Sequence, residues 1–290
     1  MLDAAIDSYL LDGKARNLRP ASILAYALQL RYFTEWAAAH GVATLEAITP
    51  TVIKTYFAAQ LQRGLSPHTV KMSGRCLRAW LNWCVAEELL PESPMKRVKL
   101  PRTDAPDPDF FTVAEVKRLL DGASIRDRAL LLFLLDSGAR LGETAALRID
   151  DIDLATGRAR LRTETKNRRP RTVYLGSIAA EAMAAWLQER PAAPHNALWT
   201  MVYSNDPISR NGLQEIIKRI GRRAQVRPCA PHRFRRTFAA WTLRSGADVA
   251  AVAELLGHGD VGMLKHYAAL IDDDLKRTHA AHSPCDNFLK

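Results

Sequence analysis

Four short segments in the second half of the chain carry residue types that can act on a phosphate group. They are SGARLGETAAL (137–147), TKNRRPRTVYL (165–175), PHRFRRTF (231–238) and LLGHGDVGMLKHYAAL (255–270). Each candidate residue has an ordinary structural explanation when it is taken alone, because arginines cap helices and tyrosines fill cores. Together they supply what phosphoryl transfer without a metal requires: Arg140, Lys166, His232, Arg235, His258 and Tyr267.

The chemistry of this set follows from the acid–base properties of its members. A tyrosine hydroxyl with a pKa near 10 is only about one part in a thousand ionised at pH 7, so a nucleophilic Tyr267 needs a base. Histidine can accept that proton. Charge on a five-coordinate phosphate needs bidentate cations, which suits arginine better than lysine. A mobile lysine can supply the proton that the leaving oxygen needs, so the set predicts phosphoryl transfer to a tyrosine.

The local sequence places three of these groups at helix starts. Arg140 precedes a helix that begins near Glu143, and an anion is already favoured at such a position. His232 and Arg235 are three residues apart at the start of another helix, so their side chains share one face.

These segments resemble the characteristic boxes of the tyrosine recombinase, or phage integrase, family. SGARLGE is similar to the first arginine box, TKNRRPRTVYL to the β-hairpin that carries a lysine, HRFRRTF to the H-x-x-R box and LLGHGD to the LGH box. The order and the spacing agree, and Tyr267 follows His258 by nine residues. The resemblance covers essentially the whole catalytic half. The first half is similar to the family's helical core-binding domain only in helix pattern, length and position.

The resemblance implies a role for each residue around the phosphate. Arg140 and Arg235 would bind the scissile phosphate, and Lys166 would protonate the 5′ oxygen. His258 would hydrogen-bond the phosphate. Glu143 is similar to the acidic residue that supports the first arginine without taking part in the chemistry.

The remaining implied roles concern the nucleophile. Tyr267 would attack the phosphate and form a 3′-phosphotyrosyl link, with His232 as general base and acid beside it. Arg236 departs from the family pattern, since many relatives have a second histidine there. The hairpin is also unusually basic, which leaves open whether Lys166 or a neighbour points into the site; its arginines are Arg168, Arg169 and Arg171.

Around these segments the sequence predicts a mainly α protein with a small antiparallel β-sheet. In the first hundred residues an apolar-periodic run at 23–39 indicates a helix, and Thr-Pro at 49–50 and Ser-Pro at 66–67 are start signals for two more. In the second half IDDIDL, RARLRT and RTVYL alternate between turns and predict a three-stranded sheet. Helices then return to the end of the chain.

The prolines between residues 91 and 110 predict the boundary between two domains. PESPMKRVKLPRTDAPDPDF holds five prolines, which remove hydrogen-bond donors and favour an extended chain. We therefore expect a helical core-binding (SAM-like) domain at 1–92, a basic linker at 93–109, a catalytic domain at 110–271 and a tail at 272–290. The resemblance implies that the two domains form a C-shaped clamp on double-stranded DNA.

Three basic groups are candidates for contact with the DNA backbone. The helix that begins after residue 66 carries three cations near one face, the linker could follow a phosphate backbone, and the hairpin turn adds more. A solvated surface stripe is the alternative explanation for the helix. The candidates are Lys71, Arg75 and Arg78, then Lys96, Arg97, Lys99 and Arg102, and then Arg168 and Arg169.

The composition agrees with a nucleic-acid partner. The formal net charge is +10, which favours an acidic ligand, although a merely soluble basic protein would carry it too.

No run of about 18 apolar residues is present and the N-terminus lacks a signal peptide's basic region, so we expect a cytoplasmic protein without a membrane partner. The four cysteines show no CxxC spacing and indicate reduced thiols. We expect no metal and no other cofactor.

The resemblance also implies assembly. Four protomers would act on two DNA sites as a homo-tetramer, or this chain would pair with a related recombinase. The tail carries the apolar pair Phe288-Leu289 close to its end, which suggests docking on a neighbouring protomer. Folding back on its own catalytic domain is the alternative.

Three other functions share part of this evidence. A type IB topoisomerase-like enzyme would use the same chemistry without choosing a site, but the separate helical domain and the tail favour a recombinase for integration, excision or dimer resolution. A non-cleaving DNA-binding protein is disfavoured because all six family positions are filled. A metal-dependent nuclease is disfavoured because the consecutive Asp272, Asp273 and Asp274 lack the spacing of metal ligands.

Overall fold

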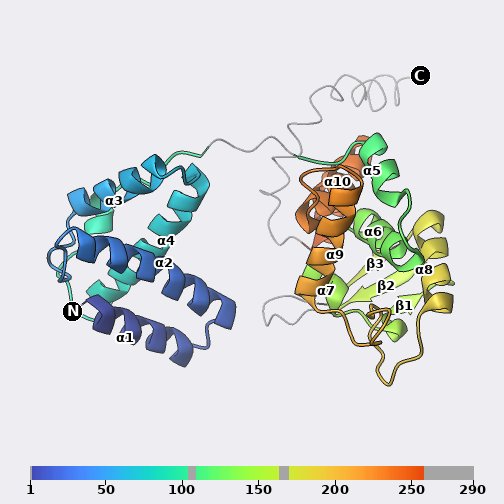
Figure 1. Cartoon of the computed structure of the whole chain (residues 1–290), viewed down its shortest axis with the longest axis horizontal. Helices are drawn as coiled ribbons and strands as arrows, with labels where there is room; N and C mark the ends of the chain where they lie inside the picture. The colour runs from blue at the N-terminus through green and yellow to red at the C-terminus, as the bar shows by residue number, and fades with distance from the viewer. Residues whose placement is uncertain (1, 104–108, 163–169, 258–290) are drawn as a thin grey trace, which may run out of the picture. The chain divides into compact units, whose positions relative to one another are not determined.

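The structure is a computed structural model, and it describes residues 2–103, 109–162 and 170–257. The chain divides into two compact units, Met1–Ala105 and Pro106–Lys290 (Figure 1). Within the described ranges, every helix is too short or too polar to cross a lipid bilayer.

The first unit is a bundle of helices. Both α3 and α4 begin at a proline that follows a hydroxyl N-cap: the Thr49 side chain accepts a hydrogen bond from the Val52 N–H, and the Ser66 side chain accepts one from Thr69. These starts confirm the signals in the sequence. The helices are α1 (Leu2–Ala15), α2 (Pro20–Ala39), α3 (Pro50–Gln62), α4 (Pro67–Ala86) and the 3-10 helix η1 (Pro94–Arg97).

Aromatic and aliphatic side chains from α2, α3 and α4 fill the core of this unit. Phe33, Ile53 and Trp80 are completely buried. The Phe33 ring meets the rings of Tyr56 and Trp80 edge to face, with centroids 5.2 and 6.3 Å apart. Burial of one such side chain stabilises the fold by about 1.5–3 kcal/mol, so the packing of these side chains between the helices stabilises the bundle.

The segment 94–103 packs on this same bundle. Met95 and Val98 are buried in its core, and Leu100 lies against Gly74 of α4. Hydrogen bonds from Lys71 Nζ to the Thr103 hydroxyl (3.0 Å) and from Arg78 to the Val98 carbonyl (3.2 Å) add to this attachment. The division between the units therefore falls at residues 105–106, after most of the expected linker, because the apolar residues between the prolines are buried.

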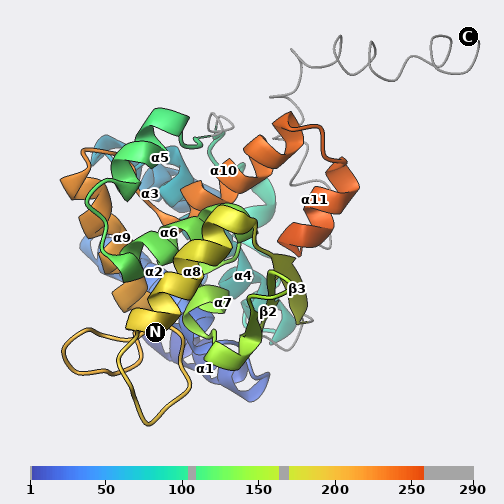
Figure 2. The same ribbon diagram turned by 90° about the vertical axis from the view of Figure 1, so that its right-hand side faces the viewer.

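A buried helix, α6, lies at the centre of the second unit. Its residues Leu130, Phe133 and Leu134 are completely buried, and α6 packs against α8, α10 and β3 (Figure 2). The helices of this unit are α5 (Val113–Leu120), α6 (Ile125–Ser137), α7 (Leu141–Ala145), the 3-10 helix η2 (Ile149–Asp151), α8 (Ser177–Glu189), α9 (Arg210–Arg223), α10 (Pro231–Arg244) and α11 (Val249–Leu256).

The strands β1 (Ile152–Asp153), β2 (Arg158–Leu161) and β3 (Arg171–Tyr174) form an antiparallel sheet in the order β1-β2-β3. This confirms the three-stranded sheet expected from the sequence. Ala159, Leu161 and Val173 are buried, so one face of the sheet meets the core. Because side chains alternate along a strand, Arg171 lies on the same inward face as Val173.

The first residues of the second unit that the structure describes are attached to α10. Arg233 of α10 is buried, and its guanidinium lies 4.1 Å from the centroid of the Phe111 ring. It forms ion pairs with Asp109 (2.6 Å) and Glu115 (2.9 Å). The Phe111 N–H donates to the Thr237 hydroxyl at 2.8 Å. These contacts set the position of α10, which carries two of the candidate catalytic residues.

The packing of Leu100 on α4 can be tested with Gly74→Ala. Alanine usually stabilises a helix interior relative to glycine by roughly 0.5–1 kcal/mol. Here the added Cβ would overlap Leu100 and approach Phe57 Cζ to 2.8 Å, so overpacking of about 1–3 kcal/mol should reverse the sign. Urea unfolding should show a less stable protein.

The matched control is Gly142→Ala in α7, where the nearest atom to an added Cβ is Arg210 Cδ at 4.0 Å. This variant should be at least as stable as the wild type. A gain in stability for Gly74→Ala equal to that of the control would show that the segment 94–103 does not pack on α4.

Candidate active site

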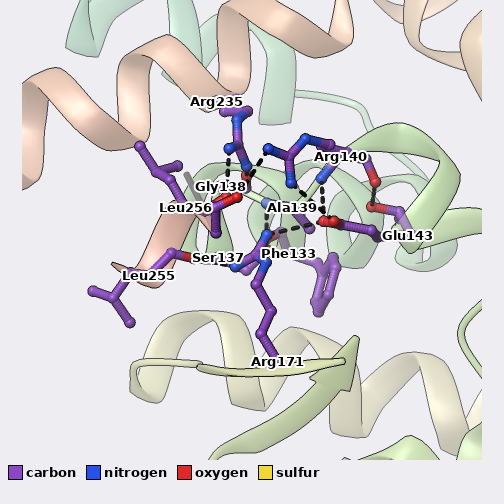
Figure 3. A network of polar contacts seen from close by, with 12 residues as sticks. Phe133, Ser137, Gly138, Ala139, Arg140, Glu143, Arg171, Arg235, Leu255 and Leu256 are labelled. Atoms are coloured by element: carbon purple, nitrogen blue, oxygen red, sulfur yellow. Dashed lines mark hydrogen bonds and ion pairs between the residues drawn. The ribbon is translucent and has the colours of Figure 1, made fainter. Parts of the chain in front are cut away.

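Three arginine side chains converge on the C-terminal end of α11 (Figure 3). Arg140 precedes α7, Arg171 lies in β3 and Arg235 lies in α10. Arg235 Nη2 donates to the Leu256 carbonyl at 2.5 Å and Arg140 Nη2 to the Gly257 carbonyl at 3.3 Å. Arg171 Nη1 donates to the Leu255 carbonyl. The last carbonyls of a helix have no partner within it and carry its negative dipole, so these arginines satisfy that end.

Glu143 connects two of these arginines. Its carboxylate accepts hydrogen bonds from the Arg140 backbone N–H (2.9 Å), from Arg140 Nη1 (3.0 Å) and from Arg171 Nη2 (2.9 Å). Burial raises the pKa of Glu143, but Arg171 and Arg140 outweigh this effect and lower the pKa overall. Glu143 is therefore ionised, and it holds Arg140 as expected of a residue that supports the first arginine.

Two glycines allow these elements to approach each other. Gly138 ends α6 with φ +57°, and its carbonyl accepts a 2.6 Å hydrogen bond from Arg235 Nη1. A Cβ at this position would lie 2.5 Å from Phe238. Gly257 ends α11 with φ +62°, and a Cβ there would lie 2.8 Å from Arg171 Cδ. Both positions need the left-handed backbone and the small volume of glycine.

His232 stands at the start of α10, directly after Pro231. Its side chain remains accessible to solvent, yet the surrounding protein still removes part of its hydration, and this lowers its pKa. The positive charges of Arg236, Arg235, Arg140 and Arg210 lower the pKa further. His232 is therefore neutral at pH 7 and able to accept a proton.

The charge of this region favours an anionic ligand. Four arginines act electrostatically on His232 and Arg171 is held beside Arg140, whereas Glu143 supplies one negative charge against them. The structure thus brings together Arg140, Glu143, His232 and Arg235 as the sequence motifs predicted. Arg210 and the inward placement of Arg171 were missed, although the alternation in RTVYL could have revealed the latter.

Several predicted residues lie outside the described ranges. Lys166 and the candidate DNA contacts Arg168 and Arg169 belong to the stretch between β2 and β3. His258 follows Gly257 directly, and Tyr267 lies further along the same undescribed stretch. Their roles stay predictions.

The candidate DNA contacts of the first unit differ in how they are engaged. Lys71 and Arg78 bind the segment 94–103, so part of the basic face of α4 has an intramolecular role. Lys96 lies 3.4 Å from Glu92 in an exposed ion pair, which contributes little to stability. The exposed cations that remain candidates for a phosphate backbone are Arg75, Lys96, Arg97, Lys99 and Arg102.

The environment of His232 predicts a measurable pKa. An NMR titration should place the pKa of His232 below the ordinary value of about 6.5, so its neutral form should persist to lower pH than in a free histidine. Arg236→Gln removes a positive charge that disfavours the imidazolium, and this should raise the pKa. Arg244→Gln, about 18 Å along the axis of the same helix, should leave it unchanged. No difference between the two variants would contradict the electrostatic account.

Comparisons with known proteins identify the family of this chain. Residues 109–273 match the model of the phage integrase family, and residues 6–88 match the model of the phage integrase N-terminal SAM-like domain. Tyrosine recombinase XerD of Bifidobacterium longum (strain NCC 2705) is 31% identical over 94% of each chain. Tyrosine recombinase XerC of Bacillus subtilis (strain 168) is 25% identical over 93% of this chain and 92% of the relative.

Solved structures share the fold. The Tn1549 transposon integrase in complex with a circular intermediate DNA has a TM-score of 0.78 at 17% identity, covering 91% of this chain and 94% of that chain. The lambda integrase dimer bound to a COC′ core site has a TM-score of 0.74 at 15% identity, covering 90% and 96%. The two family models together account for both units, and the chain is a tyrosine recombinase of the phage integrase family.

Proposed function

We propose that this enzyme cuts and rejoins double-stranded DNA at specific sites through a covalent link between Tyr267 and a 3′ phosphate. The observation that carries the proposal is the arginine cluster at the end of α11, beside a neutral His232. This cluster combines excess positive charge with a proton acceptor. A phosphodiester attacked by a tyrosine needs both of these, one for the developing charge and one for the phenol proton.

The proposed reaction begins with the two arginines that the motifs assign to the phosphate. A guanidinium carries five N–H donors, so Arg140 and Arg235 have the capacity to bind phosphate oxygens while they hold the end of α11. Their planar geometry suits bidentate binding of a phosphate. They stabilise the charge of the five-coordinate transition state.

Proton transfers complete the step. His232 takes the proton of Tyr267, the Tyr267 oxygen bonds to phosphorus, and the bond from phosphorus to the 5′ oxygen breaks. Lys166 donates a proton to that leaving oxygen. The 3′-phosphotyrosyl link conserves the bond energy, so rejoining is the same reaction in reverse, with a 5′ hydroxyl as the attacking group.

The relatives, which are tyrosine recombinases, support a setting in which two DNA sites recombine. Recombination between two DNA sites involves four strand breaks, which a homo-tetramer, or this chain together with a related recombinase, would supply. The tail at 272–290 would join neighbouring protomers. Integration, excision and dimer resolution all fit this reaction, and we place it in the cytoplasm with the DNA on which it acts.

Covalent capture tests the proposal and identifies the DNA site in the same experiment. Tagged protein is incubated with fragmented genomic DNA of the encoding organism that carries random nicks, because a nick beside the cleavage site releases the 5′ hydroxyl and prevents rejoining. The mixture is denatured in SDS, the protein is recovered by its tag, and the attached DNA is sequenced. The wild type should carry DNA that ends at one shared sequence. Tyr267→Phe, which loses only the phenolic oxygen, should bind DNA but carry none after denaturation.

Each other outcome has a defined meaning. Adducts without a shared sequence would favour the type IB topoisomerase-like alternative. Adducts with the Phe variant would overturn the assignment of Tyr267, and their absence from both proteins would overturn the proposed function.

Because Arg140 and Arg235 are assigned to the scissile phosphate, their loss should slow cleavage much more than it weakens DNA binding. Arg140→Ala or Arg235→Ala should slow single-turnover cleavage of a nicked duplex carrying the captured site by at least about a hundredfold. Duplex affinity should change much less, because it is spread over many contacts. Arg118→Ala, which removes an exposed arginine from α5, is the control. Cleavage within a few-fold of wild type for both arginine variants would place the active site elsewhere.

A further inference from the structure

We infer that Arg171 is a positioning residue that holds the α11 terminus and Glu143 against strand β3, so that the phosphate-binding arginines and β3 keep a fixed arrangement. Its consequence for cleavage rests on the proposed function. Its effect on the position of these elements can be measured without DNA.

The contacts of Arg171 bridge three separate elements. Its backbone belongs to β3, opposite Leu161 of β2. One arm of its guanidinium, Nη2, forms a 2.9 Å ion pair with Glu143 of α7, and the other arm, Nη1, donates to the Leu255 carbonyl of α11. The side chain is only 12% exposed, so these contacts are shielded from water and from salt.

The surroundings of Arg171 are built to receive it. Gly257 leaves room for its side chain, since a Cβ at that position would lie 2.8 Å from Arg171 Cδ and 3.0 Å from its Nε. The same hypothetical Cβ would lie 3.7 Å from Arg140 Nη1, which shows how closely the two guanidinium groups share this space. Two neighbouring guanidinium groups repel each other, and the Glu143 carboxylate, which binds both, offsets the repulsion.

Each element that Arg171 contacts leads to a residue of the proposed reaction. Glu143 also binds Arg140, the Leu255 carbonyl lies three residues before His258, and β3 directly follows the stretch that holds Lys166. The two arms of Arg171 are directed at protein acceptors, which is why we assign it to positioning rather than to contact with the phosphate. Lysine cannot replace it fully, because an ammonium lacks the planar fork that reaches two acceptors on different elements.

The first test is hydrogen–deuterium exchange of the DNA-free protein. In Arg171→Met, amide exchange should accelerate in α7 (Leu141–Ala145) and α11 (Val249–Leu256) and stay unchanged in α8 (Ser177–Glu189). Arg171→Lys should show an intermediate effect and guards against a Met variant that fails to fold. Arg160→Met is the matched control, because Arg160 is an exposed arginine of the neighbouring strand β2. In this variant, the amides of α7 and α11 should exchange at the wild-type rate.

The second test is single-turnover cleavage of the nicked duplex carrying the captured site. Arg171→Met should form the covalent adduct at least about tenfold more slowly, with duplex affinity within about twofold of wild type. If Arg171 acts through Glu143, the double variant Arg171→Met/Glu143→Gln should be no slower than the slower single variant. A double variant whose rate of adduct formation falls by the product of the two single effects would show that Arg171 does not act through Glu143.

The two tests separate this inference from the proposed function. Unchanged exchange in α7 and α11 of Arg171→Met, or cleavage at the wild-type rate, would overturn the role of Arg171. A wild type that forms no adduct would overturn the proposed function, while faster exchange in the variant would still support the structural role.

Discussion

The arrangement of the site depends on the match between three arginines and the C-terminal end of α11. A buried guanidinium needs hydrogen-bond acceptors, and the last carbonyls of a helix need donors. Arg171, Arg235 and Arg140 meet three consecutive carbonyls, those of Leu255, Leu256 and Gly257. Backbone carbonyls fix the arginines without cancelling their charge. Three carboxylates would fix them as well, but they would neutralise the cluster and repel a phosphate.

Other parts of the second unit maintain this match. Gly138 and Gly257 end α6 and α11 with positive φ, which brings the two helix ends close to α10 and β3. On the far side of the Arg235 helix, Arg233 is paired with Asp109 and Glu115, so α10 is held from both faces. The segment that enters the unit is therefore attached to the same helix that carries His232 and Arg235.

The features that the sequence predicted are those set by local rules. Proline after a hydroxyl residue predicted the starts of α3 and α4, and alternation between turns predicted the sheet. The resemblance to the family's boxes, rather than a local rule, implied that Arg140, Glu143, His232 and Arg235 belong to one site.

The features that the sequence did not reveal depend on long-range packing. The prolines near residue 100 indicated an open linker, but burial of Met95 and Val98 and the fit of Leu100 against Gly74 attach this segment to the first unit. The contacts of Lys71 and Arg78 with Thr103 and Val98 follow from that attachment. Similarly, nothing in the hairpin sequence indicates that Arg171 meets α11, because their contact joins residues 84 positions apart.

The most direct test of the account is a crystal structure of Tyr267→Phe bound to a duplex that carries the captured site. We expect Arg140 and Arg235 each to lie within hydrogen-bonding distance, about 3 Å, of the non-bridging oxygens of one phosphate. Their contacts with the Gly257 and Leu256 carbonyls should persist in that complex. A phosphate bound away from both guanidinium groups, or arginines that leave the end of α11 to reach it, would contradict the account.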